Sequence, residues 1–233
     1  MQIGGIHRFS LIDYPAKTAC VVFTQGCNLR CPYCHNPELI RPDARAHRLL
    51  TGPIFDFLEE RKGKLDAVVI TGGEPTLQPD LPDFIREIIR RGYLVKLDTN
   101  GTNPVLLEKL LADNLLSYVA LDIKAPLDRY APFAPDGLEE TVGKAVGKSV
   151  ALVRGSGTAH EFRTTMVRKL LSPADVTLIA EYIQGASRYV LQRFVASHTY
   201  DPAFLTAEPF SDEKLTELAE ICQSFGIQEV LIR

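Results

Sequence analysis

Short apolar runs rich in β-branched residues alternate with amphipathic segments along most of the 233-residue chain. The runs predict strands, and the segments between them predict helices. The expected strands are 19–24, 65–71, 94–98, 116–122, 161–167 and 189–196, with a short final strand at 228–232. The expected helices are 53–62, 80–91, 104–112, 138–154, 172–184 and 211–225. This alternation predicts an α/β fold whose strands are parallel, linked by right-handed crossovers and buried on both faces.

The alternation runs without a linker or a low-complexity segment, so we expect a single domain over residues 1–233. Residues 1–17 read as a lead-in to the α/β unit at 18–233, with a turn at 10–15. We expect irregular structure at 37–50 and a loop at 197–210. Periodicity alone does not separate a barrel from a doubly wound sheet, but both place reactive groups at the carboxyl ends of the strands.

Three of the five cysteines, Cys27, Cys31 and Cys34, lie just after the first predicted strand with the spacing C-x3-C-x2-C. Three thiolates on one short loop can bind three irons of a [4Fe–4S] cluster and leave the fourth iron open. Zinc normally takes four ligands, and His35 is sterically awkward as a fourth because it adjoins Cys34. The other two cysteines are far apart in the sequence, which argues against a disulfide. The spacing therefore favours an iron–sulfur cluster.

The overall charge and hydropathy narrow the function classes. The formal net charge is −3, which gives no electrostatic case for nucleic-acid binding. No apolar run approaches the ~20 residues that span a membrane, and the N-terminus has no apolar signal segment. We therefore expect a cytoplasmic protein without membrane or nucleic-acid partners. Clustered cysteines in that compartment indicate metal or redox chemistry.

Polar residues follow several predicted strands at the point where each strand ends. They are Gly72-Gly73-Glu74-Pro75, Asp98-Thr99-Asn100-Gly101, Asp122-Ile123-Lys124 and His198. Each alone would be an ordinary turn or surface residue. Their coincidence at one end of the sheet indicates a binding site, and paired glycines let a ligand approach the backbone.

With C-x3-C-x2-C at one strand end and Gly-Gly-Glu-Pro at the next, the chain resembles the radical S-adenosylmethionine (SAM) superfamily. The resemblance implies a partial (β/α)6 barrel of parallel strands. It implies a [4Fe–4S] cluster on Cys27, Cys31 and Cys34, with SAM bound to the open iron. The cluster of such enzymes reduces SAM to methionine and a 5′-deoxyadenosyl radical.

The resemblance also assigns a SAM site. The glycine pair would line the methionine part of SAM, Glu74 would support the same network, and Tyr33 would lie beside the adenine. The residues expected to bind SAM are Tyr33, Gly72, Gly73, Glu74, Asp98, Asn100, Lys124, Arg163 and His198.

Within the superfamily, the chain resembles the activases of glycyl-radical enzymes through Asp98, Asp122-Ile123-Lys124 and His198. This resemblance implies a monovalent cation beside the SAM carboxylate, held by Asp98, Thr99, Asp122 and the backbone of Ala120. Lys124 and His198 would contact the SAM carboxylate and ribose. A cation and an ammonium can neutralise that carboxylate. Arg163 would face SAM or a peptide substrate, and Asp13 and His35 match peptide-contacting positions.

The segments 10–15, 23–37 and 69–75 are similar to those of anaerobic ribonucleoside-triphosphate reductase activating proteins. This similarity implies that the chain abstracts hydrogen from one glycine Cα of a partner glycyl-radical enzyme. An electron donor such as flavodoxin or ferredoxin would then be a second partner. Three alternatives stay open: a pyruvate formate-lyase activase, a small-molecule enzyme such as 7-carboxy-7-deazaguanine synthase, and a non-enzymatic iron–sulfur electron carrier. The carrier would need a fourth protein ligand, His35 or Cys222.

Overall fold

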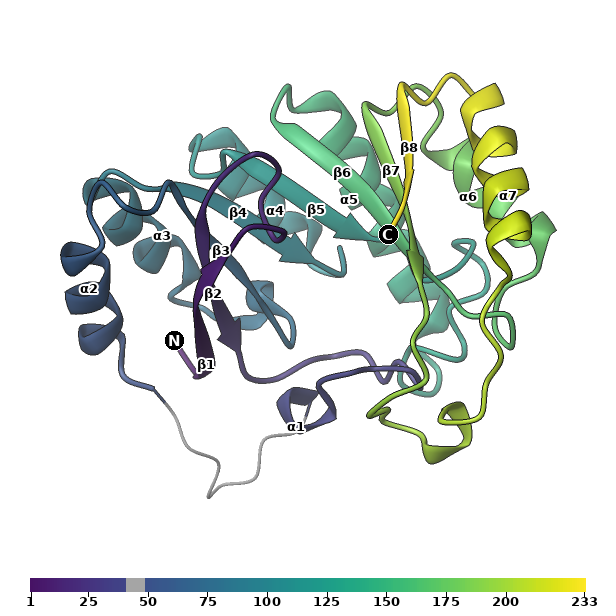
Figure 1. The fold of residues 1–233 in the computed structure, drawn as a ribbon, viewed down its shortest axis with the longest axis horizontal. Helices are drawn as coiled ribbons and strands as arrows, with labels where there is room; N and C mark the ends of the chain where they lie inside the picture. Colours follow the sequence, from purple (N-terminus) through teal and green to yellow (C-terminus); the bar gives the residue numbers. More distant parts are fainter. Residues whose placement is uncertain (41–48) are drawn as a thin grey trace.

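A single curved sheet organises the computed structural model, which describes residues 1–40 and 49–233 (Figure 1). Its described strands are hydrogen-bonded in chain order, with β1 and β8 at the two edges. Strands β2 to β8 are parallel and β1 is antiparallel to β2. The strands are β1 Ile3–Ser10, β2 Ala19–Thr24, β3 Ala67–Gly72, β4 Leu94–Thr99, β5 Tyr118–Asp122, β6 Ala159–Met166, β7 Arg188–Arg193 and β8 Glu229–Ile232. The open, curved sheet confirms the predicted α/β fold of the partial-barrel type.

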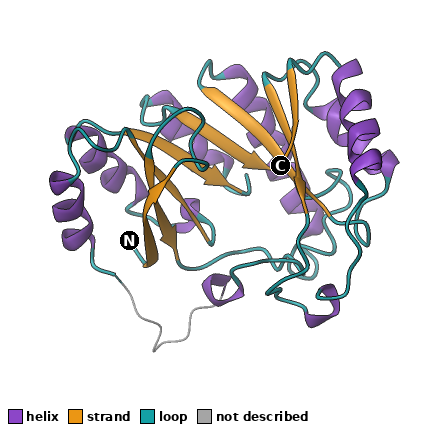
Figure 2. Ribbon diagram, in the orientation of Figure 1, coloured by secondary structure: helices purple, strands orange, loops and turns teal. Residues whose placement is uncertain are grey.

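Helices α2 to α7 lie along the convex side of the sheet, whereas the short helix α1 lies below it (Figure 2). They are α1 Pro37–Ile40, α2 Thr51–Glu60, α3 Leu81–Arg90, α4 Pro104–Ala112, α5 Glu139–Gly155, α6 Pro173–Tyr182 and α7 Asp212–Ser224. Short 3-10 turns occupy Pro75–Leu77 and Pro202–Phe204. Ser172 and Ser211 cap α6 and α7 by accepting backbone hydrogen bonds, which fixes where these helices begin. No described helix has both the length and the apolar character that crossing a membrane would require.

The lead-in predicted at residues 1–17 differs in the structure, because Ile3–Ser10 forms strand β1. The pairing of Ile3 with Thr24 and of His7 with Val21 adds this strand to the edge of the sheet. Its Gly-Gly pair and half-exposed middle hide the strand pattern in the sequence. The irregular segment predicted at 37–50 begins with α1, and its residues 41–48 lie outside the described residues.

The two faces of the sheet differ in character, since successive side chains of a strand point to opposite faces. On the convex face, residues such as Val68, Leu97 and Phe162 are fully buried in the main apolar core. The concave face holds a small apolar cluster at β2 and β3, and charged residues along β4, β5 and β6. These strands are still largely buried on both faces, as expected, since Lys96 and Glu161 are 2% and 0% exposed, but the side chains buried on this face are charged. The concave face is where the sheet gathers its polar side chains.

Candidate active site

The cysteine loop, residues 25–36, leaves the carboxyl end of β2 and crosses the lower side of the molecule in Figure 1. Backbone hydrogen bonds fix it to three other segments: Cys27 N–H to the Ile40 carbonyl (3.1 Å), Arg30 N–H to the Phe133 carbonyl (2.7 Å) and Tyr200 N–H to the Cys34 carbonyl (3.1 Å). These hydrogen bonds satisfy backbone groups of the loop that a helix or a strand would otherwise pair. The loop is therefore held in one shape by α1, which directly follows it, and by two segments far away in the sequence.

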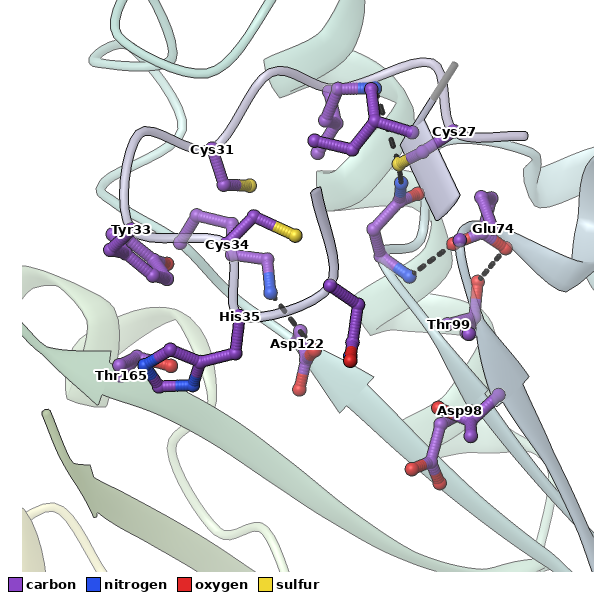
Figure 3. A pocket seen from close by; sticks show the side chains of 18 of the residues that line it. Cys27, Cys31, Tyr33, Cys34, His35, Glu74, Asp98, Thr99, Asp122 and Thr165 are labelled. Carbon is purple, nitrogen blue, oxygen red and sulfur yellow. Dashed lines mark hydrogen bonds and ion pairs between the residues drawn. The ribbon is translucent and has the colours of Figure 1, made fainter. Parts of the chain in front are cut away.

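The three cysteine thiols of this loop line one cavity of about 280 Å³. Figure 3 shows the sulfur atoms of Cys31 and Cys34 pointing across open space toward that of Cys27. All five cysteines are free thiols, and Cys20 and Cys222 are buried in the apolar core, away from this cavity. Burial raises the pKa of the Cys27 thiol to about 11 and that of Cys31 to about 12. Cluster binding, which needs thiolates, would therefore release protons.

The arrangement of the thiols fits an iron–sulfur cluster better than a single ion. Within the described residues, no group of three His, Cys, Asp or Glu side chains converges closely enough to hold one metal ion. The thiolates of a [4Fe–4S] cube bind three different irons, so they need not meet at one point. Cys27, Cys31 and Cys34 would hold the cluster, and the rest of the cavity is lined by both polar and apolar residues.

Gly72 and Gly73 line the cavity at the end of β3, and both are required by the packing of β3 against β2. Gly72 has a φ of +113°, and a Cβ there would lie 2.4 Å from the Thr24 nitrogen. A Cβ on Gly73 would lie 2.1 Å from the Gly26 carbonyl oxygen. The glycine pair therefore lets β3 approach the start of the cysteine loop, a structural role that the sequence did not reveal.

Glu74 is fully buried and connects the ends of β3 and β4. Its carboxylate accepts hydrogen bonds from Thr76 N–H (3.0 Å) and Oγ1 (2.6 Å), from Thr99 Oγ1 (2.7 Å) and from Asn100 N–H (2.7 Å). Burial raises the pKa of this carboxyl group, and the four donors oppose the rise. Its backbone N–H donates to the Gly26 carbonyl (2.7 Å), which ties the same residue to the cysteine loop.

Asn100 carries this network to the cysteines. Its side-chain Nδ2 donates to the side-chain Oδ1 of Asn28 (3.1 Å) and lies 3.9 Å from the Cys27 sulfur. Its Oδ1 accepts hydrogen bonds from the backbone (3.0 Å) and hydroxyl (2.6 Å) of Thr102. Asn100 therefore positions the first cysteine from the adjacent strand ends.

The opposite wall of the cavity is ionic. Arg163, on β6, donates from Nε to Asp122 (2.7 Å) and from Nη1 to Asp98 (3.0 Å). Lys124 donates to the second oxygen of Asp122 (2.9 Å). Burial opposes ionisation of Asp122, but the charges of Arg163 and Lys124 outweigh it and hold its pKa well below the ordinary value. Burial likewise opposes the charge of Lys124 and Arg163, yet Asp122 raises the pKa of each.

Tyr33 lines the cavity between the last two cysteines and is 5% exposed. Its ring packs edge-on against Phe133 and Phe194, with centroids 6.1 and 6.4 Å away. Burial raises the pKa of its hydroxyl, which has no hydrogen-bond partner among the described residues. The ring is therefore fixed at the cavity wall, and its contact with adenine stays a prediction.

Most of the predicted site residues meet at this cavity, although their roles toward SAM stay predictions. Those that line it are Cys27, Cys31, Tyr33, Cys34, Gly72, Gly73, Glu74, Asp98, Thr99, Asn100, Asp122, Lys124 and Arg163. Ala120 is fully buried on β5, between Asp98 and Glu161 in the strand register, and does not line the cavity.

His198 is the clearest exception. Its side chain is 69% exposed, it does not line the cavity, and its Nε2 lies 3.3 Å from the carboxylate of Glu38. His35 lines the cavity rim, with its ring stacked on Phe194. Asp13 lies outside the cavity, where its side chain accepts a hydrogen bond from Ser10.

Four concave-face residues were missed by the sequence reasoning. Thr165 and Gln192 line the cavity from β6 and β7. Lys96 and Glu161 are buried beneath it, where Lys96 Nζ lies 3.1 Å from Asp98 and 3.6 Å from Glu161. Each is one or two positions from a predicted site residue on the same strand or on a neighbouring strand. The two-residue period of a strand was the available signal, because Lys96 and Asp98, like Glu161 and Arg163, share one face.

A family model described as "Radical SAM superfamily" matches residues 21–148, more than half of the chain. A Methanocaldococcus jannaschii protein described as a "putative glycyl-radical enzyme activating enzyme" is 36% identical over 99% of this chain and 95% of that protein. The chain therefore belongs to the radical SAM superfamily. It is a radical SAM enzyme, and the expected [4Fe–4S] cluster and SAM are the cofactors of that family.

Other similarities cover about half of the chain or less. The pyruvate formate-lyase-activating enzyme of Clostridium pasteurianum is 36% identical over 53% of this chain and 52% of that enzyme. The 7-carboxy-7-deazaguanine synthase of Aquifex aeolicus is 40% identical over 34% of each chain. In structure, the SuiB protein of Streptococcus suis bound to its precursor peptide SuiA superimposes with a TM-score of 0.67. That match covers 91% of this chain and 48% of SuiB at 14% identity, and it concerns the fold alone.

Proposed function

We propose that this protein is an activase that generates a glycyl radical on a partner enzyme, and that the partner is an anaerobic ribonucleoside-triphosphate reductase. The observation that carries the proposal is the 36% identity, over 99% of the chain, to a protein described as an activating enzyme of this kind. The partner assignment rests on the motifs at 10–15, 23–37 and 69–75.

In this proposal the residues of the cavity have three roles: binding the cluster, positioning the cysteine loop and binding SAM. Cys27, Cys31 and Cys34 hold the cluster, which supplies the electron that cleaves SAM and yields the hydrogen-abstracting radical. Asn100 and Glu74 keep the cysteine loop in register with the ends of β3 and β4. Lys124 offers an ammonium to the carboxylate end of SAM from the ionic wall.

The open sheet suits a protein substrate. Strands β1 and β8 are edges that do not pair with each other, so the concave side is not closed by a continuous ring of strands. A glycine loop of a partner enzyme needs such an opening to bring its Cα to the cavity. The electron donor belongs to this proposal as well, with flavodoxin or ferredoxin as the expected class.

The test uses the anaerobically reconstituted, reduced protein with SAM and purified anaerobic ribonucleoside-triphosphate reductase. Electron paramagnetic resonance should detect a glycyl radical on the reductase, and its yield should fall to background when the reductase glycine is replaced by alanine. Pyruvate formate-lyase serves as the competing partner. A radical on pyruvate formate-lyase alone would show that the partner assignment is wrong. SAM cleavage without a radical on either enzyme would contradict the activase proposal.

A small-molecule reaction is the second candidate, supported by the 40% identity to a 7-carboxy-7-deazaguanine synthase. That similarity covers 34% of the chain, against 99% for the activating-enzyme relative. Formation of 7-carboxy-7-deazaguanine by the reduced protein would favour this candidate over the activase.

A further inference from the structure

The concave face carries a set of six buried or half-buried charges, called here the inner charge cluster: Lys96, Asp98, Asp122, Lys124, Glu161 and Arg163. Three are cations and three are carboxylates, so their formal charges cancel. The side chains of Lys96 and Glu161 are 2% and 0% exposed, and those of Asp98 and Arg163 are 11% and 12% exposed. Charges at this depth persist only when they are paired.

The two carboxylates that the activase resemblance assigns to a monovalent cation are already paired with protein cations. Asp122 lies 2.7 Å from Arg163 through one oxygen and 2.9 Å from Lys124 through the other. Asp98 lies 3.0 Å from Arg163 through one oxygen. Its other oxygen lies 3.1 Å from Lys96, as an ion pair without hydrogen-bond geometry. Each of these four oxygens therefore has a positively charged nitrogen within 3.1 Å.

The other two groups assigned to that cation are also committed or buried. The hydroxyl of Thr99 donates to Glu74 (2.7 Å). Ala120 is fully buried between its strand neighbours. A metal ion would have to displace the Arg163 guanidinium or the Lys96 ammonium from Asp98. It would also add a fourth positive charge to a cluster that is already neutral. The residues present therefore do not fit the predicted cation site.

Lys96 is held in place from a second direction. Its ammonium donates to the backbone carbonyl of Asp13 (2.6 Å), in the turn between β1 and β2, and lies 3.6 Å from Glu161. An ammonium on a side chain is a compact point charge, as a monovalent metal ion is. Lys96 is thus a cation that cannot dissociate, fixed by one backbone oxygen and two carboxylates.

We propose that Lys96 and Arg163 take the place of the monovalent metal cation in this enzyme, so that SAM binding and cleavage do not depend on Na⁺ or K⁺. Lys96 acts as a positioning residue. It holds Asp98, which holds Arg163 and through it Asp122 and Lys124 beside the SAM site. The proposal concerns SAM alone and is independent of which partner the enzyme activates.

The first experiment needs no variant. Equilibrium dialysis measures SAM affinity of the anaerobically reconstituted enzyme in KCl, NaCl or choline chloride, all at an ionic strength of about 0.1 M so that screening is equal. SAM cleavage without a partner enzyme is measured in the same three salts. We expect both quantities to agree within about two-fold, which is under about 0.5 kcal/mol. Affinity or cleavage at least about ten-fold lower in choline chloride would overturn the proposal.

The second experiment tests whether removing the Lys96 ammonium makes SAM binding depend on K⁺ or Na⁺. In Lys96→Met the fixed charge is gone, so we expect weaker SAM binding in choline chloride and recovery in KCl or NaCl. Thermal melting of the cluster-free protein supplies a readout apart from activity. K⁺ or Na⁺ should raise the melting temperature of Lys96→Met relative to choline, and leave the wild type unchanged. Lys64→Met, which removes an exposed lysine, is the matched control.

Each outcome of the second experiment bears on Lys96. A Lys96→Met protein with wild-type SAM affinity in all three salts would overturn the role of Lys96. If this variant does not fold, the salt series on the wild-type enzyme and the melting of its cluster-free form decide the proposal. Stabilisation of the cluster-free wild type by K⁺ or Na⁺, but not by choline, would reveal a metal cation site and overturn it.

Discussion

The two walls of the cavity keep negative charge in opposite ways. On the wall formed by β3 and β4, the carboxylate of Glu74 is surrounded by neutral hydrogen-bond donors, and burial raises its pKa. On the wall formed by β5 and β6, the carboxylate of Asp122 faces Arg163 and Lys124, which hold its pKa low. Neutral hydrogen-bond donors are enough to hold the buried Glu74 carboxylate in its structural role beside the cysteine loop. The wall that would face a charged ligand instead pairs its carboxylates with cations.

The largest effect on SAM cleavage should come from the three cysteines, which line the same cavity as both walls. Replacing Cys27, Cys31 or Cys34 by alanine should abolish cluster binding and SAM cleavage, because the cluster keeps only two protein ligands. Iron content and SAM cleavage by the reconstituted protein measure this. The matched control is Cys222→Ala, which removes a buried core cysteine and should keep the cluster. A cysteine variant that still cleaves SAM would show that the cavity is not the cluster site.

Breaking the ionic wall should have the next largest effect. Arg163→Met leaves the carboxylates of Asp98 and Asp122 without their shared counter-ion, and losing one partner of a buried pair costs about 3–5 kcal/mol. Urea unfolding of the cluster-free protein should show that loss. SAM affinity should fall because Asp98 and Asp122 each keep one cation, Lys96 and Lys124, but lose the charge that neutralises their second oxygen.

Arg163→Lys separates charge from geometry. A lysine restores one positive charge but cannot bridge both carboxylates with a planar fork, so its stability and SAM affinity should lie between those of the wild type and Arg163→Met. Wild-type stability in Arg163→Met would mean that the ionic wall does not hold the fold together.

The same contrast explains what could be predicted from the sequence. The strands and helices follow from local apolar periodicity, and the cysteine loop and the residues at the ends of β3, β4 and β5 follow from the rule that barrel sites form at strand carboxyl ends. Two members of the ionic wall, Lys96 and Glu161, did not follow, because their burial depends on how the sheet curves. The two-residue period places each of them on one face with a predicted site residue, but their contact spans β4, β5 and β6 and depends on the register of these strands.

The hydrogen-bonded wall can be weakened without removing its shape. Glu74→Gln keeps one acceptor oxygen but places an amide donor against the buried donors of Thr76, Thr99 or Asn100. We expect a loss of about 1–3 kcal/mol in the free energy of unfolding, the usual cost of a buried polar group without its partner.

The comparison variant is Glu60→Gln on the exposed face of α2, which should change stability little. If Glu74 acts only through the hydrogen bonds it accepts, Glu74→Gln should reduce stability and cluster retention. The molecules that keep their cluster should then bind SAM with nearly wild-type affinity. A selective loss of SAM affinity with unchanged stability would instead place Glu74 in direct contact with SAM.

The smallest effect should come from His198, which belongs to neither wall. Its side chain is 69% exposed and its only described polar contact is Glu38 at 3.3 Å, a surface pair of the kind that contributes little. We expect His198→Ala to change SAM affinity by less than about two-fold, as equilibrium dialysis against the wild type and Lys124→Ala would measure. Lys124→Ala should weaken binding because it removes an ammonium from the cavity itself. A His198→Ala loss as large as that of Lys124→Ala would mean that the segment after β7 closes over SAM. The cavity would then have a third wall, which forms only when the ligand binds.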